Sequence, residues 1–302
     1  MKNQKPKVIV IVGPTASGKT STSIEVAKRL NGEIVSADSM QIYKEMDIGT
    51  AKPTIEERAG IKHYMLDVVS PDEEFNVSKY KIMAEDAIEE ILKNGKTPII
   101  VGGTGLYVNS LIDSIEFIDV KEDIEYRNEC LEKAEKYGPQ FLHDELRKID
   151  EEAAEKIDVN NVRRVIRALE VFKVTGKTKT ELDKESIKEP KYDYLVYGID
   201  WDRAILYERI EKRVDIMLND GLIEEVKDLM NKYNFSKTAI QGLGYKEVVE
   251  YLENSISYEE MVEKLKMETR RYAKRQLTWF RRDKRITWCK IDEIVNKILQ
   301  DY

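Results

Sequence analysis

The sequence predicts an α/β fold: a phosphate-loop (P-loop) core with a parallel sheet, helices on both faces of that sheet, and an all-helical insertion domain. Three observations predict it. Short apolar, β-branched runs alternate with helical patterns along most of the chain, as expected for a parallel sheet. A phosphate-loop pattern follows the first run. Residues 113–192 carry no convincing strand pattern and indicate several charged helices.

The first strand and the turn after it organise the chain. Residues 7–12 form the buried strand, and G-x-x-x-x-G-K-T begins at Gly13. Gly13 and Gly18 let backbone N–H groups turn toward an anion, and a helix from Lys19 adds its positive dipole end. Lys19 supplies a mobile charge, and the Thr20 hydroxyl can ligate Mg²⁺. The predicted phosphate or diphosphate site comprises Gly13, Pro14, Thr15, Ala16, Ser17, Gly18, Lys19 and Thr20.

The next two strands each deliver a turn to the same edge of the sheet. Residues 32–41 contain a short strand that ends near Asp38, and residues 97–101 form a strand that runs into Gly102-Gly103-Thr104-Gly105. Carboxyl ends of parallel strands form the ligand crevice, so Asp38 is expected to face the phosphate loop. An ordinary surface turn is the alternative for Asp38. A further strand end is expected within residues 61–67, where nothing makes His63 a ligand.

The middle of the chain predicts helices over 122–135, 139–148, 151–157 and 161–174. The last has the clearest buried stripe, formed by Val162, Val165, Ile166, Leu169 and Phe172. Arg163, Arg164 and Arg167 lie off that stripe, with no acid among them before Glu170. A solvated face is the usual meaning of such charges. An edge that faces an anion is at least as well supported.

Strand pattern returns at residues 194–199, so the helical block interrupts the sheet domain. A helix over 202–218 carries Arg209 and Arg213 one turn apart, where they either close over the phosphates or pair with Glu208 and Glu211. A final helix over 257–279 interleaves basic residues with aromatic ones, which suits RNA phosphates and stacked bases. Its basic residues include Arg270, Arg271, Lys274 and Arg275, and the aromatic residues are Tyr272, Trp279 and Phe280.

Composition limits the class of protein. The chain has 302 residues, 41% hydrophobic content and a net charge of −7. Residues 263–290 nevertheless carry a net charge of +8, and residues 119–158 carry −7, which fits an anionic partner at one face only. Two distant cysteines argue against a zinc site and a disulfide framework. No apolar run suits a membrane span, and residues 1–6 show no signal-peptide core, so we expect a cytoplasmic protein.

The strand over 98–101 ends in Gly-Gly-Thr, where a phosphate-hydrolysing enzyme usually has its magnesium aspartate. The one acid at a well-defined strand end beside the loop is Asp38. A carboxylate there can serve as base for an acceptor bound beside the phosphates. The residues therefore predict group transfer in which the loop holds a diphosphate as leaving group.

Seven segments together resemble the tRNA dimethylallyltransferase family over nearly the whole chain. They are GPTASGKT at 13–20, DSMQIYK at 38–44, GTAKP at 49–53, PIIVGGTGLY at 98–107, RVIRALEVF at 164–172, RIEKRVDIML at 209–218 and TRRYAKRQLTWFRR at 269–282. The resemblance is to the bacterial type, because the zinc-finger extension of eukaryotic members is missing. His63-Tyr64 departs from the paired histidines of the family, so His63 is given no catalytic role.

The resemblance implies two substrates and separate roles for the core and the insertion. The loop would bind dimethylallyl diphosphate with Mg²⁺, and the acceptor would be N6 of the adenosine 3′-adjacent to the anticodon of tRNA. Residues 1–112 and 193–302 would form the core, and residues 113–192 would contact the anticodon stem-loop. A monomer is expected. Asp38, Lys19, Thr20 and Arg213 would be catalytic, with Arg209 as a further diphosphate ligand. The tRNA-binding candidates are Asp38, Ser39, Met40, Gln41, Thr104, Arg127, Arg163, Arg164, Arg167, Arg270, Arg271, Lys274 and Arg275.

Two other activities fit the same loop. An adenylate isopentenyltransferase would use AMP or ATP as acceptor, although a mononucleotide needs neither the insertion nor the basic final helix. A small-molecule kinase would consume ATP with a hydroxyl acceptor.

Overall fold

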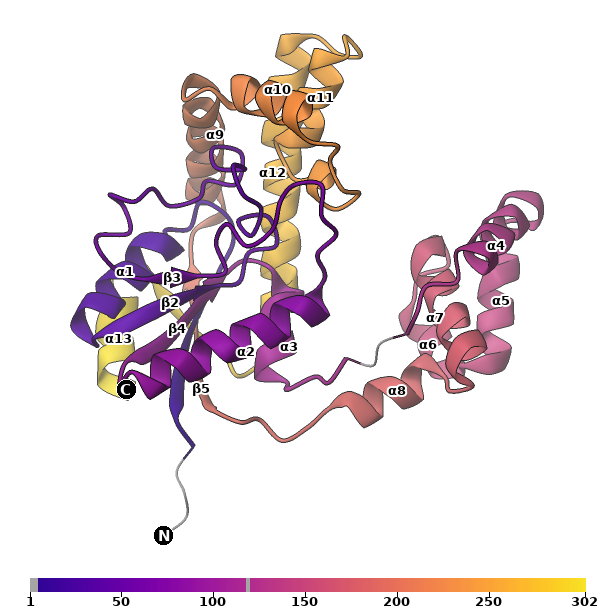
Figure 1. The fold of residues 1–302 in the computed structure, drawn as a ribbon, viewed down its shortest axis with the longest axis horizontal. Coiled ribbons are helices and arrows are strands. Elements are labelled where there is room, and N and C mark those ends of the chain that lie inside the picture. The colour runs from indigo at the N-terminus through magenta and orange to yellow at the C-terminus, as the bar shows by residue number, and fades with distance from the viewer. Residues whose placement is uncertain (1–4, 118–119) are drawn as a thin grey trace. The chain divides into compact units, whose positions relative to one another are not determined.

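The computed structural model describes residues 5–117 and 120–302 (Figure 1). Residues 1–4, where no signal-peptide core is expected, and Asp119 of the acidic segment lie outside the described residues. The chain divides into two compact units, a core unit of residues 1–112 with 190–302 and an insertion unit of residues 113–189. Residues 190–192 belong to the core rather than to the insertion as expected, because Tyr192 is buried in the core cluster and Lys191 pairs with Glu85.

The core unit is built on one parallel sheet of six strands in the order β3-β2-β4-β1-β5-β6. The strands are β1 (Lys7–Val12), β2 (Gly32–Ser36), β3 (His63–Tyr64), β4 (Thr97–Gly102), β5 (Asp193–Asp200) and β6 (Thr287–Lys290). The strand expected over 61–67 is reduced to β3, because Met65 and Asp67 adopt positive φ angles of 64° and 55° that no strand continues through.

Helices cover both faces of this sheet, as Figure 1 shows for α1 and α13 on one side and α2 and α3 on the other. The core helices are α1 (Lys19–Arg29), α2 (Val77–Lys93), α3 (Gly105–Ile112), α9 (Arg203–Asn219), α10 (Leu222–Lys232), the 3₁₀ helix η1 (Ala239–Gln241), α11 (Tyr245–Leu252), α12 (Tyr258–Phe280) and α13 (Ile294–Asp301).

Alternation along β1 explains the two layers. Val8 and Val10 pack into the cluster that contains α2 and α3, whereas Ile9 and Ile11 pack into the cluster that contains α1 and α13. A strand buried on both faces needs apolar residues at every position. The predicted α/β fold with helices on both faces is confirmed.

The insertion unit is helical in its described part and has its own core around Leu142, Leu146 and Val165. Its helices are α4 (Ile124–Tyr137), α5 (Pro139–Ile149), α6 (Glu151–Lys156), α7 (Val162–Thr175) and α8 (Lys179–Ser186). The stripe expected on α7 is wrong at Phe172, whose side chain is 37% exposed; Ala168 and Val171 are buried instead. None of the described helices is long and apolar enough to cross a membrane.

Candidate active site

The phosphate loop joins β1 to α1 and is braced by side chains from elsewhere in the chain. Gly18 takes a φ of 91° as the residue before α1, a conformation that favours glycine. The indole Nε1 of Trp201 donates to the Ser17 carbonyl at 2.9 Å, and Nε of Arg209 donates to the Ala16 carbonyl at 2.8 Å. Lys19 Nζ donates to the Pro14 carbonyl at 2.6 Å. These bonds fix the shape of the loop by occupying its carbonyl oxygens.

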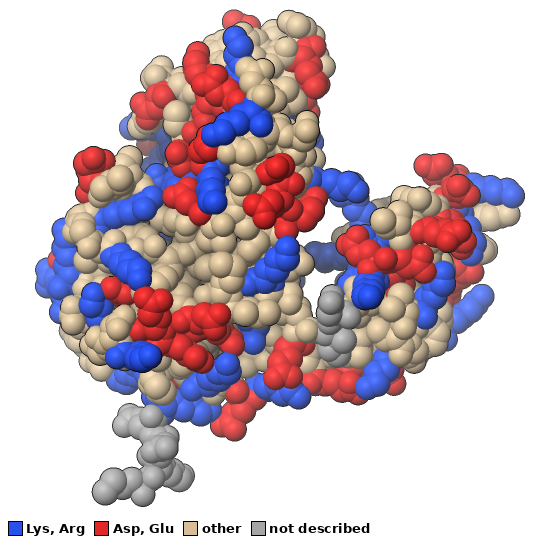
Figure 2. All heavy atoms as spheres, in the orientation of Figure 1, with Lys and Arg blue, Asp and Glu red and all other residues tan. Residues whose placement is uncertain are grey.

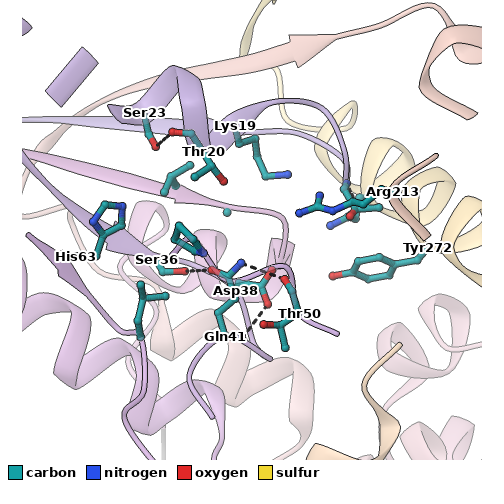
Figure 3. Close-up of a pocket in the computed structure, with 16 residues that line it drawn as sticks. Lys19, Thr20, Ser23, Ser36, Asp38, Gln41, Thr50, His63, Arg213 and Tyr272 are labelled. Carbon is teal, nitrogen blue, oxygen red and sulfur yellow. Dashed lines mark hydrogen bonds between the residues drawn. The ribbon is translucent and has the colours of Figure 1, made fainter. Parts of the chain in front are cut away.

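Side chains from four elements converge beside this loop (Figure 3). Lys19 comes from α1, Asp38 follows β2, Arg213 comes from α9 and Tyr272 from α12. Three adjoining cavities share these residues, and Arg213 lines all three. One cavity extends from Asp38 and Tyr272 along α12 with a volume of about 490 Å³. That volume lies within the ~300–1,000 Å³ usual for small-molecule sites.

Asp38 lies in a turn and also faces the site, so the two alternatives for this residue coincide. Its Oδ1 accepts from the Met40 N–H at 2.9 Å and from the Gln41 N–H at 3.4 Å. Within the described chain its Oδ2 makes no hydrogen bond, and the residue lines two of the cavities. One oxygen thus anchors the carboxylate while the other stays available to a ligand.

Two cations near Asp38 lie in an environment that favours an anion. Burial, and then the charge of Arg213, lower the pKa of Lys19 from its ordinary 10.5 to about 7, while Asp38 acts in the opposite direction. Burial also lowers the pKa of Arg213, again opposed by Asp38. A bound anion would stabilise both charged forms. This electrostatic state fits a phosphate-binding site.

For the α9 arginines, the alternative of pairing with Glu208 and Glu211 is wrong. Glu211 pairs with Arg270 at 2.5 Å, and among the described residues neither Arg209 nor Arg213 forms an ion pair with Glu208 or Glu211. The Arg209 guanidinium lies 4.7 Å from the Trp201 ring centroid. Both arginines line the cavity that Lys19 and Thr20 also line.

Similarity to known proteins agrees with this geometry. The model of a protein family described as IPP transferase matches residues 41–283. The chain belongs to this family. It is 55% identical to a tRNA dimethylallyltransferase of Acetivibrio thermocellus over 288 residues, which cover 95% of this chain and 92% of the relative.

Solved structures of IPP transferases agree as well. A tRNA isopentenylpyrophosphate transferase of Bacillus halodurans superposes with a TM-score of 0.72 at 45% identity, covering 97% of this chain and 94% of that one. A eukaryotic dimethylallyltransferase described as acting on tRNA gives a TM-score of 0.77 at 36% identity, covering 91% of this chain and 69% of that one. These structures confirm the α/β fold.

Within this IPP transferase, the residues expected around the acceptor take two roles. Ser39 and Met40 line the long cavity with Asp38. Thr104 instead supports Ser39, whose N–H donates to Thr104 Oγ1 at 3.0 Å. The Gln41 amide donates to the Thr50 carbonyl at 3.2 Å, so Gln41 holds the wall of the cavity as well as lining it.

Sequence patterns gave no role to Gln276, Trp201 or Glu225, whose contacts are long-range. The Thr15 N–H donates to Gln276 Oε1 at 2.8 Å, across 261 residues. The carboxylate of Glu225 accepts from the backbone N–H of Ile48 at 2.7 Å and of Gly49 at 3.1 Å, which holds the loop that carries Thr50. Nothing local in the sequence marks these side chains, because their partners are distant along the chain.

His63 lines the cavity that Lys19 and Asp38 also line, and its Nδ1 is 2.9 Å from the Ile61 carbonyl oxygen. Burial lowers its pKa, which favours the neutral imidazole. A magnesium site made of protein ligands alone is not supported, since the described residues hold no group of three His, Cys, Asp or Glu suited to a metal. Thr20, whose hydroxyl makes no hydrogen bond within the described chain, lines the cavity and suits an ion that arrives with a phosphate.

The insertion arginines divide into two kinds. Arg127 and Arg167 both bind the buried carboxylate of Glu170, at 2.9 Å and 2.6 Å. The acid that ends the basic run of α7 is thus turned inward, where it pairs with Arg167 as well as Arg127. Arg163 and Arg164 are exposed and have no acidic partner within the described chain. On the face drawn in Figure 2, acidic and basic side chains are intermixed on this unit.

The basic residues of α12 divide in the same way. Arg270 is paired with Glu211, and Arg271 with Glu268 at 2.6 Å. Lys274 is exposed without an acidic partner within the described chain, and Arg275 lines the long cavity near Tyr272. The unpaired cations, rather than the segment charge, mark the surfaces available to an anionic partner.

Proposed function

We propose that this IPP transferase transfers a dimethylallyl group from dimethylallyl diphosphate to N6 of the adenosine 3′-adjacent to the anticodon of tRNA, and releases diphosphate. It acts as a monomer in the cytoplasm. One observation carries the proposal: the carboxylate of Asp38 and the cations Lys19 and Arg213 line the same cavity. A base and a leaving-group site thus face each other across a space that a reacting carbon can enter.

On the donor side, the protein stabilises the leaving group. The allylic C1–O bond breaks with carbocation character, so negative charge accumulates on the diphosphate. Lys19, Arg213, Arg209 and the N–H groups of the phosphate loop meet that charge. A single preorganised donor of this kind is worth about 3–4 kcal/mol in the transition state.

On the acceptor side, Asp38 activates the amine. The lone pair of the adenine amino group is delocalised into the ring, so the nitrogen is a poor nucleophile. A carboxylate hydrogen-bonded to N6 raises its reactivity and accepts the proton as the N–C bond forms. The base has to leave its stack to reach this cavity, at a cost of a few kcal/mol that contacts with Ser39, Met40 and Tyr272 offset.

Magnesium would reach the site with the donor. Thr20 would ligate Mg²⁺ together with oxygens of the diphosphate and water, as is usual for this ion. Bound there, the ion would supply additional neutralisation of the leaving group.

Most of the RNA is bound outside the reaction cavity, through contacts with its phosphates. Arg163 and Arg164 on α7 and Lys274 and Arg275 on α12 are the cations best placed for this, because their charges are not neutralised by an acidic partner. The ion-paired arginines contribute less directly to RNA binding, because their ion pairs hold in place the helices that carry the unpaired cations. They are Arg127, Arg167, Arg270 and Arg271.

Labelled dimethylallyl diphosphate, incubated with the protein and either bulk tRNA or AMP, tests this function. The proposal expects label in tRNA and none in AMP. Label in AMP alone would identify an adenylate isopentenyltransferase. ATP consumption with a hydroxyl acceptor would identify a kinase, which the Gly-Gly-Thr end of β4 does not favour.

A further inference from the structure

Gln276 on α12 connects the two glycine-rich turns of the site. Its Oε1 accepts from the Thr15 N–H in the phosphate loop at 2.8 Å, and its Nε2 donates to the Gly103 carbonyl after β4 at 2.9 Å. The side chain is only 6% exposed. A buried primary amide is thus used as acceptor on one side and as donor on the other, which few side chains can do.

The contact is close enough to depend on glycine. A Cβ on Gly103 would lie 2.1 Å from Gln276 Nε2. The turn therefore approaches α12 through its bare backbone, and the amide fills the space between them.

Beyond Gly103 the connection continues to the acceptor side. The Thr104 N–H donates to the Ala37 carbonyl at 3.1 Å, and Thr104 Oγ1 accepts from the Ser39 N–H at 3.0 Å. Asp38 lies between these two anchored residues. A chain of hydrogen bonds thus runs from the phosphate loop through Gln276 to the turn that carries the carboxylate.

The same helix also meets the acceptor cavity. Tyr272 precedes Gln276 by one turn and lines the cavity with Asp38. Burial, and then the charge of Asp38, raise the pKa of Tyr272, so the phenol keeps its proton. Lys274 and Arg275 lie between Tyr272 and Gln276 in the sequence and are exposed to solvent.

We propose that Gln276 is a positioning residue that sets the separation between the phosphate loop and the turn of Asp38, and hence between leaving group and base. The inference rests on the proposed function. Gln276 lines the cavity with Asp38, but its Oε1 and Nε2 are bonded to the backbone of Thr15 and Gly103. It acts through the backbone of Thr15 and Gly103, so its loss misaligns the two halves of the site. A misplacement of about 1 Å costs roughly 10²-fold in rate.

Two substitutions separate positioning from simple packing. Gln276→Met keeps the length of the side chain and removes both hydrogen bonds. Gln276→Glu keeps the acceptor for Thr15, but its carboxylate opposes the Gly103 carbonyl. A protonated glutamic acid has one C=O and one O–H in place of the amide, and a carboxyl buried against a carbonyl oxygen holds its proton to higher pH than usual. The Glu variant should therefore recover as pH falls.

The experiment measures kcat for tRNA labelling with dimethylallyl diphosphate between pH 5.5 and 8.5, as the ratio of variant to wild type. We expect Gln276→Met to lose roughly 10²-fold at every pH, with the KM for tRNA little changed. We expect the ratio for Gln276→Glu to rise toward one as pH falls. Thr278→Ala is the matched control, because Thr278 is exposed and its hydroxyl donates to the Lys274 carbonyl of the same helix.

Wild-type kcat in Gln276→Met, or a ratio for Gln276→Glu that does not change with pH, would overturn the positioning role. If Gln276→Met does not fold, as judged by circular dichroism, the pH dependence of the Glu variant decides alone. Failure of the wild type to label tRNA would instead sink the proposed function, so the two failures are distinguishable.

Discussion

Arginines of the core cavity and arginines of the insertion are used differently. Arg213 is half-buried beside Lys19 and has no ion pair within the described chain. In the insertion, Arg127 and Arg167 share the wholly buried carboxylate of Glu170. The cavity leaves its positive charge for a ligand, whereas the insertion uses its charge to hold its own helices together. A basic side chain therefore indicates an anion-binding site when the folded protein gives it no acidic partner.

The largest expected effect comes from Asp38, the carboxylate that lines the same cavity as Lys19 and Arg213. Asp38→Asn should lower kcat by about 10²–10⁴, the range for a general base, because the amide cannot take the proton from N6. Filter binding should give tRNA affinity close to that of the wild type. Abolished tRNA binding with unchanged kcat would make Asp38 a recognition residue.

The next effect comes from the unpaired arginine itself. Arg213→Ala should lower kcat/KM for dimethylallyl diphosphate by about 10²–10³, since it removes one donor to the leaving group. Because no ion pair is broken, the melting temperature should not fall. Arg270→Ala on the neighbouring helix is a control for the removal of a charge, because Arg270 is neutralised by Glu211. Equal losses in the two variants would contradict the distinction between paired and unpaired arginines.

Glu170→Gln tests the insertion side of the comparison. Loss of the charged partner should destabilise the protein by about 1.5–3 kcal/mol, at the hydrogen-bond scale for charged groups, because both arginines still reach water. Burial acts to raise the pKa of Glu170, but the Arg127 and Arg167 contacts lower it overall from 4.5. Its stabilisation is thus present above pH 4.5 and is lost as pH falls through the lowered pKa.

Chemical denaturation at pH 7 and pH 3.5 measures this loss. The difference between wild type and Glu170→Gln should shrink at the lower pH. Equal stability of the two proteins at pH 7 would show that the buried ion pairs do not hold the insertion.

The lowered pKa of Lys19 predicts a pH dependence of donor binding. Above its pKa of about 7, the Lys19 amine is neutral in the unliganded protein. If the diphosphate requires the ammonium form, Lys19 must take up a proton when the diphosphate binds. The affinity for dimethylallyl diphosphate should therefore fall with rising pH, by up to about tenfold per pH unit, until the pKa in the complex is reached. By the same linkage, the unliganded protein gains stability between pH 7 and 10.5, where the unfolded chain holds the proton and the folded chain does not.

Calorimetric titration from pH 6.5 to 9 checks the affinity, with Lys19→Arg as the control that stays charged. The variant should show a flatter profile. A wild-type affinity that does not change over this range would place the Lys19 pKa elsewhere.

The smallest effect concerns the exposed pair on α7. Removal of one arginine that binds a phosphate should reduce the magnitude of the slope of log affinity against log salt by roughly one unit. Arg163→Ala and Arg164→Ala should each show this for tRNA, and donor binding should keep its own salt dependence. Lys156→Ala is a matched control, because Lys156 is paired with Glu152. Slopes that stay at the wild-type value would leave these arginines as solvated residues.

Much of the core was predictable, because its signals are local. The phosphate loop, the strand before Asp38 and the glycine-rich turn after β4 each follow from a continuous pattern. Asp38 could be placed because strand ends of a parallel sheet share one edge. The helix expected over residues 202–218 agrees with α9 to within one residue at each end.

What could not be predicted depends on partners distant in sequence. In the sequence, Glu170 marks only the end of a basic run, because nothing local shows that it is buried against Arg127, 43 residues away. Gln276 lies within a basic segment whose pattern concerns its exposed face, and its two partners come from other elements. The short β6 and the helix α13 were missed because they complete the sheet and cover it only in the folded core.

The division between a catalytic core and an RNA-holding insertion is tested most directly by single-turnover kinetics at saturating tRNA and donor. The two variants to compare are Arg213→Ala and the double variant Arg163→Ala/Arg164→Ala. We expect the double variant to reach the wild-type rate constant once tRNA saturates, while Arg213→Ala stays about 10²–10³ below it at any concentration. A slow double variant beside a wild-type rate in Arg213→Ala would contradict this division.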